Sequence, residues 1–257
     1  MFRLGRLSGI ALTLTALAAS SAQAQAPAGQ LYGVHREHAN PARIGDYEKT
    51  SHEFATAMKE SKISSFPANF ITWSYDDLTY DYIAPMTDMN DLAKVPATFA
   101  ELAGKMGGDK FGDLMSRANP TMLSWDDVII RERPDLEFTP EKPRVSREET
   151  GAMRFDYYYL TPGAETQLDQ LAKDWRALGA AKGIRDGYRV FESVTGPGLP
   201  LLIVATPGKN PADLTAAWDA NVKTGGAEWQ ALMARTLGLC RKFETKVGTW
   251  RGDLSAR

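Results

Sequence analysis

The chain has 257 residues, of which 43% are apolar and 24% charged, and its formal net charge is −2 at pH 7. This mild acidity argues against a nucleic-acid partner, because proteins that bind nucleic acids present a basic face to the phosphates. Cys240 is the only cysteine, which excludes an intrachain disulfide, and the apolar content is sufficient for a core without such cross-links.

Residues 1–24 have the pattern of a secretory signal. Arg3 and Arg6 precede an apolar run over residues 7–19, and small residues follow up to Ala24. We expect cleavage after Ala24 or two residues later. An uncleaved membrane anchor is the alternative, but the apolar run is shorter than the ~20 residues of a spanning helix. No later segment has that length either, so the sequence predicts a periplasmic or secreted protein without a transmembrane segment.

The first half of the mature chain, residues 31–137, is expected to alternate strands and helices. Asn40 and Pro41 are typical of a helix N-terminus, the first as the cap and the second in the first turn. The spacing of apolar residues and the turn residues predict the rest. The expected elements are a strand at 31–38, a helix from Asn40 that ends at Phe66, strands at 69–75 and 80–84, a helix at 88–106 with a break at Pro96, a short helix after Gly108, and a strand at 125–133.

A polar segment with two prolines, residues 138–151, reads as a linker. The second half, residues 152–257, then repeats the order of elements. It is expected to contain strands at 153–160, 188–194, 201–205 and 243–250, and helices that begin at Thr161, Asn210 and Trp229.

A thirteen-residue stretch occurs once in each half. Residues 105–117 and 223–235 share a lysine, two glycines, a leucine, a methionine and an arginine in register. Gly107 matches Gly225 at a separation of 118 residues, and other matched landmarks lie 118 to 122 residues apart. Such a constant separation indicates a duplicated unit. The glycine pair follows the lysine, which is typical of a helix C-terminus and not of a phosphate-binding loop.

Each unit has the β-α-β-β-α-β order of the split βαβ, or ferredoxin-like, motif. A four-stranded sheet with both helices on one face leaves its other face bare, and two units can cover these faces mutually. We therefore predict an α+β fold in which two tandem ferredoxin-like units form an intrachain dimeric α+β barrel. A monomer is sufficient for such a barrel, and further oligomerisation stays open.

The order of elements and the tandem copies resemble the dimeric α+β barrel superfamily. The second half begins FDYYYLTPG at residues 155–163, ahead of an amphipathic helix, and this is similar to the start of NIPSNAP-like domains. An arginine that often accompanies the first strand in that group occurs here as Arg36, without a counterpart in the second half. The resemblance implies a pocket between sheet and helices. It implies no particular reaction, because the superfamily includes haem-handling enzymes, cofactor-free monooxygenases and many uncharacterised proteins.

The three histidines, His35, His38 and His52, lie within eighteen residues, which raises the question of a metal or haem site. Residues three apart on a strand point to opposite faces, so His35 and His38 cannot hold one ion unless the strand is broken there. Hydrogen bonding at the surface or in the core is the ordinary explanation for all three. We predict no metal site, and His35 is the candidate for a catalytic or ligand-contacting histidine.

Aromatic residues are concentrated in the predicted strands. They could line a cavity for a small apolar or aromatic molecule. They could equally form an ordinary sheet core, since aromatic residues favour strands. The candidate ligand-binding residues are Trp73, Tyr75, Tyr82, Tyr157 and Tyr159.

The common catalytic motifs are missing: there is no Gly-x-Ser-x-Gly elbow, no His-Glu-x-x-His and no dinucleotide fingerprint. We predict an exported protein that binds a small apolar or aromatic molecule, with no cofactor assigned. The alternatives are a monooxygenase-like or haem-related enzyme that uses His35, and a structural or partner-binding protein without a ligand. Because His35 has Asp156 as its approximate counterpart, we expect the function to lie in the first half.

Overall fold

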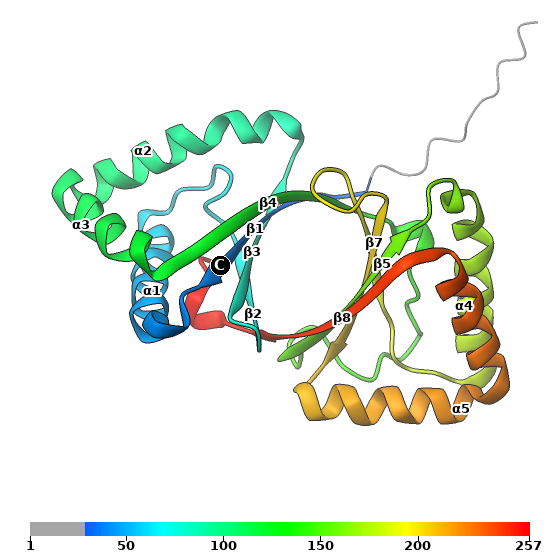
Figure 1. Cartoon of the computed structure of the whole chain (residues 1–257). Helices are drawn as coiled ribbons and strands as arrows, with labels where there is room; N and C mark the ends of the chain where they lie inside the picture. Colours follow the sequence, from blue (N-terminus) through cyan, green and yellow to red (C-terminus); the bar gives the residue numbers. More distant parts are fainter. Residues whose placement is uncertain (1–28) are drawn as a thin grey trace, which may run out of the picture.

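A computed structural model describes residues 29–257, so the predicted signal segment lies outside the described residues. Within this range, eight antiparallel strands close into a barrel and five α-helices lie outside it (Figure 1). The strand order around the barrel is β1-β3-β2-β8-β5-β7-β6-β4. None of the helices in this range combines the length and hydropathy of a membrane span. The α+β barrel that the sequence predicts is confirmed.

The two halves contribute their elements in the same order. The first half contains β1 (Leu31–Ala39), α1 (Ile44–Ser61), β2 (Ile71–Tyr75), β3 (Thr79–Met86), α2 (Val95–Met106), α3 (Gly108–Ala118) and β4 (Met122–Glu132). The second half contains β5 (Ala152–Leu160), α4 (Leu168–Lys182), β6 (Arg189–Ser193), β7 (Leu201–Gly208), α5 (Pro211–Gly238) and β8 (Cys240–Trp250). Around the barrel, each half places its fourth strand beside its first, followed by its third and its second.

Several helix positions differ from the sequence prediction, and three of these differences have an identifiable structural cause. Helix α1 ends at Ser61, before the predicted end, because Lys62 takes a left-handed conformation with a φ of 53°. Pro96 does not break α2, since it lies in the first turn of that helix, where its missing N–H costs nothing. Helix α4 begins only at Leu168, after Gly163 has turned the chain with a φ of 90°.

Both glycine pairs of the repeated stretch interrupt a helical path, as predicted. Gly107 separates α2 from α3 with a φ of 89°. Gly226 interrupts α5 with a φ of 56° and a ψ of −135°. Positive φ values of this kind carry little cost only for glycine. Since Gly107 matches Gly225 in the sequence, the break falls one residue later in the second copy.

The segment at 138–151 runs along the second half. Phe138 and Tyr188 exchange backbone hydrogen bonds, and the Arg144 N–H donates to the carbonyl of Arg185 at 2.9 Å. Val145 is buried. The segment is therefore attached to the fold by its backbone as well as by a side chain.

The two halves are joined along strand edges and through the interior of the barrel. The edges pair where β2 meets β8 and where β4 meets β6. The interior is filled by apolar side chains from both halves, such as the edge-to-face pair of Trp73 and Phe155, whose ring centroids are 5.9 Å apart. Gly248 lies beside this pair, and a Cβ there would come within 3.2 Å of Phe155, so the absence of a side chain permits the close packing.

A buried ion pair lies in the barrel interior beside this apolar core. The guanidinium of Arg36 donates to both carboxylate oxygens of Asp81, each at 2.7 Å, and the Tyr75 hydroxyl donates to the same carboxylate at 2.9 Å. Arg36 also donates to the Tyr157 hydroxyl at 3.2 Å. The Asp81 side chain is only 4% exposed. These residues come from β1, β3, β2 and β5, so the network ties the two halves together.

Removing one partner of this ion pair should destabilise the barrel strongly. An Asp81→Asn variant leaves the largely buried Arg36 guanidinium, whose side chain is 23% exposed, without its counter-ion, and we expect a loss of about 3 kcal/mol in the free energy of unfolding. Urea unfolding followed by circular dichroism measures it. Glu53→Gln is the matched control, because it breaks the half-exposed pair with Arg117 and should cost less than about 1 kcal/mol. Equal losses in the two variants would contradict this interpretation.

Candidate functional site

A cavity of about 710 Å³ lies in the first half, between the outer face of β1, β3 and β4 and the three helices of that half. We call it the first cavity, and its volume is typical of small-molecule sites. Side chains alternate along a strand, so Gly33, His35 and Glu37 of β1 line this cavity while Arg36 points into the barrel. A Cβ at position 33 would lie 2.6 Å from the Phe66 ring, so glycine gives this wall its shape.

Most of the first cavity is apolar. Three aromatic rings form one wall: Phe54 stacks on Phe70 and on Phe99, with centroid distances of 6.3 Å and 5.8 Å. Met58 and Ile129 add aliphatic surface. Such a wall favours apolar ligands, and any orientation of the ligand has to come from the polar part of the lining.

The polar part of the lining is a connected group that we call the His35 cluster: His35, Glu37, Tyr47, Tyr82 and Asp127. His35 Nδ1 lies 2.8 Å from Asp127 Oδ1, and His35 Nε2 lies 3.1 Å from Glu37 Oε1. The Tyr47 hydroxyl donates to Glu37 Oε2 at 2.6 Å, and the Tyr82 hydroxyl oxygen is 2.8 Å from that of Tyr47. Because the only hydroxyl proton of Tyr47 is directed at Glu37, Tyr82 is the donor in the last contact.

The carboxylates of the cluster keep His35 charged. Burial lowers the pKa of His35, but the hydrogen bonds and negative charges of Glu37 and Asp127 outweigh it and bring this pKa to about 9. His35 is therefore an imidazolium at neutral pH and donates from both nitrogens. Burial raises the pKa of Tyr47 and of Tyr82 far above the usual range, so both remain neutral phenols.

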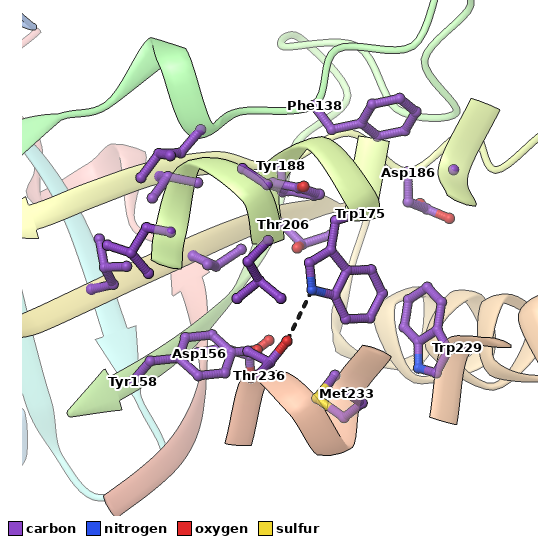
Figure 2. Close-up of a pocket in the computed structure, with 18 of the residues that line it drawn as sticks. Phe138, Asp156, Tyr158, Trp175, Asp186, Tyr188, Thr206, Trp229, Met233 and Thr236 are labelled. Carbon is purple, nitrogen blue, oxygen red and sulfur yellow. Dashed lines mark hydrogen bonds between the residues drawn. The ribbon is translucent and has the colours of Figure 1, made fainter. Parts of the chain in front are cut away.

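The corresponding space in the second half is largely filled, leaving a second cavity of only about 140 Å³ (Figure 2). Trp175 and Trp218 each pack edge to face against Trp229, with centroid distances of 4.8 Å and 5.5 Å. The Trp175 indole N–H donates to the Thr236 hydroxyl at 3.0 Å. These large side chains occupy the volume that stays open in the first half.

The two halves can be aligned residue by residue through a register shift that occurs in both sheets. The pairing of β1 with β4 shifts between His38 and Ala39, and that of β5 with β8 shifts between Tyr159 and Leu160, so Ala39 corresponds to Leu160. This alignment places Asp156 at the position of His35. Asp156 is 2% exposed and accepts hydrogen bonds from the Arg154 guanidinium and the Thr245 hydroxyl. The second cavity therefore has a satisfied carboxylate where the first has an imidazolium.

The structure separates the residues that the sequence singled out. His35 and Tyr82 line the first cavity. Trp73, Tyr75 and Tyr157 lie inside the barrel and Tyr159 packs against them, so these four share no cavity with Tyr82. A ligand-binding role for the five aromatic residues stays a prediction.

The histidines also lie apart from one another. His38 Nε2 is 3.5 Å from Asp126 on the other face of β1, and the His52 ring donates to the Asp253 carbonyl at 2.8 Å. Within residues 29–257, no group of three or more His, Cys, Asp or Glu side chains has the arrangement of a metal site.

Three residues of the His35 cluster were missed at the sequence level. Glu37 could have been found, because residues two apart on a strand share a face. Asp127 becomes a neighbour only through the register of β1 with β4, and Tyr47 only through the packing of α1 on the sheet.

No protein-family model and no curated protein matches the chain. Solved structures do match it. An anthrone oxidase-like protein aligns with a TM-score of 0.56 at 14% identity, over 88% of this chain and 93% of its own. The chain has a dimeric α+β barrel fold. A mutant chlorite dismutase from Candidatus Nitrospira defluvii shares this fold, with a TM-score of 0.52 at 10% identity over 87% of this chain and 92% of its own. At such identities the likeness concerns the barrel and its helices.

The charge of His35 should make the stability of the protein depend on pH. A pKa of about 9 in the folded state exceeds the ordinary value of 6.5, so the stabilisation is complete below about pH 6.5 and is lost as the pH rises through 9. We expect the melting temperature of the wild type to fall across this range and that of His35→Gln to fall less. Scanning calorimetry measures both. His38→Gln, changed on the opposite face of the same strand, is the control, and an unchanged decline in His35→Gln would refute the assignment.

Proposed function

We propose that the protein binds a small, predominantly apolar or aromatic molecule in the first cavity. The observation that carries this proposal is the contrast between the two cavities, about 710 Å³ against about 140 Å³. Large tryptophan side chains fill the second cavity, whereas the first keeps its volume and adds a polar cluster. Open apolar volume weakens the packing of a core, so its retention in one half supports a use for it.

The two parts of the lining have different roles in this proposal. The aromatic wall of Phe54, Phe70 and Phe99 supplies apolar contact area. The His35 cluster fixes the orientation of the bound molecule through hydrogen bonds. The cluster is itself held in place, because Glu37 is bonded on both oxygens, so little side-chain freedom is lost on binding.

A second candidate function is acid–base catalysis of the monooxygenase-like kind. The observation that favours it is an imidazolium in the wall of the cavity whose two nitrogens contact carboxylates. His35 holds protons at both Nδ1 and Nε2, and in this role a bound substrate takes the place of one carboxylate and receives a proton from the imidazolium. The anthrone oxidase-like structure shows that this barrel occurs in a protein described in terms of oxidation chemistry.

The residues present do not fit haem, the cofactor that a haem-related enzyme would need. Haem iron is held by histidine, cysteine or tyrosine, or by methionine together with histidine. Of the three histidines, only His35 lines either cavity, and both of its nitrogens carry protons directed at carboxylates. The raised pKa values of Tyr47 and Tyr82 oppose a phenolate ligand. No step through haem follows from this site.

The family assignment and the cellular location are also proposals. We propose that the halves are duplicated ferredoxin-like units of NIPSNAP-like type, supported by the identical strand order and the matched helix breaks. We propose further that residues 1–24 direct export to the periplasm or beyond. Fractionation of cells that express the full chain tests this proposal, because removal of residues 1–24 should retain the protein in the cytoplasm. Equal export of both forms would overturn it.

Ligand binding should disappear when the first cavity is filled. Ala118 lines the cavity at the end of α3, and a tryptophan there would occupy part of its volume. With naphthalene derivatives as probes, we expect a concentration-dependent rise in the melting temperature of the wild type that Ala118→Trp lacks. Ala227→Trp on the exposed side of α5 is the control and should respond like the wild type.

Two further measurements make this test decisive. Circular dichroism of unliganded Ala118→Trp establishes that the variant is folded. Native mass spectrometry of the freshly purified wild type reveals any molecule that it retains. A wild type that retains no molecule and responds to no probe would exclude the proposed function.

A further inference from the structure

The protons of the His35 cluster are all directed at other members of the cluster. Both N–H groups of His35 point to carboxylates, at 2.8 Å and 3.1 Å. The Tyr47 hydroxyl donates to Glu37, and the Tyr82 hydroxyl donates to Tyr47. None of these donors is free for a bound molecule.

Acceptor capacity remains in the same cluster. Two carboxylate oxygens provide about four lone-pair sites. Glu37 uses one site on each oxygen, for His35 and Tyr47, and Asp127 uses one site on Oδ1. The Glu37 side chain is only 16% exposed, so water has poor access to the acceptor sites that it has left. A ligand without a donor would cover these sites and leave them unpaired, which costs affinity.

The net charge of the cluster also favours a ligand group that donates hydrogen bonds. Two carboxylates and one imidazolium give it a formal charge of −1. No lysine or arginine is among the described residues that line the first cavity. An anionic ligand group would therefore lie near two carboxylates with no free cation to pair with, whereas a cation would complete the neutralisation.

We infer that the ligand of the first cavity is an apolar molecule that carries a hydrogen-bond-donating group, an ammonium in preference to a hydroxyl, and that lipophilic carboxylates are rejected. This inference rests on the proposed function, because it specifies the chemistry of the molecule that the cavity takes. The donor group binds at the free lone pairs of Glu37 and Asp127, while the apolar body lies against the aromatic wall. The acceptors thus select the ligand's polar end, and the wall tolerates different apolar bodies.

Four probes that share one ring system test the inference: 2-naphthylmethylamine, 2-naphthalenemethanol, 2-methylnaphthalene and 2-naphthoic acid. Isothermal titration calorimetry gives the dissociation constants at pH 7. We expect the amine to bind about tenfold to a hundredfold more tightly than 2-methylnaphthalene, since its hydrogen bonds are charge-assisted. The alcohol should lie between them, and the acid should bind more weakly than the hydrocarbon.

Two variants locate the selectivity. Glu37→Gln removes the charge and introduces an amide donor, so within this variant the affinity of the amine should fall close to that of 2-methylnaphthalene. Asp127→Asn should reduce the preference in part, and it is expected to fold because the Asp127 side chain is 72% exposed. Asp126→Asn, which changes the adjacent carboxylate on the other face of β4, is the control and should keep the preference.

The outcomes separate the inference from the proposed function. Equal affinities for the amine and the hydrocarbon, or tightest binding of the acid, would overturn the inference and leave the proposed function intact. Binding of no probe at all would overturn both. A preference that persists in both Glu37→Gln and Asp127→Asn would also overturn the inference, because another part of the molecule would then select the amine.

Discussion

The mutual burial of two half-sheets inside the barrel is the constraint on which the rest of this structure depends. Each half covers one face of its strands with helices and would otherwise expose the other, which is lined by aromatic and aliphatic side chains. Contacts such as that of Trp73 with Phe155 bury these faces against each other. The Arg36 and Asp81 pair lies within the first half, and the hydrogen bond from Arg36 to the Tyr157 hydroxyl of the second half adds a directional contact that apolar packing alone does not supply.

Because the interior faces of the sheets hold the two halves together, the helix-covered faces can differ between the halves. In the second half, three tryptophans pack into the space between sheet and helices and supply that half with a dense core. In the first half, phenylalanine rings line the same space without filling it. The first half therefore has more open volume across this layer, and beside it the buried Leu254 packs in one cluster with Ala39, Tyr47 and Tyr80. A stable interior is what permits an open layer outside it.

Much of the fold could be predicted from local signals. Asn40 and Asn210 cap helices by accepting backbone hydrogen bonds, and these asparagines with the prolines that follow them are recognisable without a structure. Gly107 is a comparable local signal for a helix end, because its positive φ suits only glycine. The end of α1 was mispredicted because Lys62 adopts a left-handed conformation that its residue type does not announce.

The candidate site was much less predictable, since it depends on packing between distant segments. Because side chains alternate along each strand, Tyr82 of β3 and Tyr157 of β5 can be assigned to opposite faces of the sheet. The alternation does not show which of the two faces borders a cavity. That depends on the sizes of side chains contributed by helices, Phe54 in one half and Trp229 in the other. The His35 cluster joins residues 35 and 127, which are 92 positions apart. Only the register of β1 with β4 brings them together.

The alignment of His35 with Asp156 bears on how many first cavities each barrel contains. In a barrel made by two identical chains, every residue occurs twice by symmetry, so a site on the outer face of one sheet has an equivalent on the other. Here both half-sheets belong to one chain, and positions 35 and 156 carry different residues in differently filled surroundings. A barrel of this kind offers one equivalent of the first cavity for each chain. A ligand bound there as proposed would follow a single-site isotherm, without the statistical factor or the coupling between halves that a symmetric barrel would have.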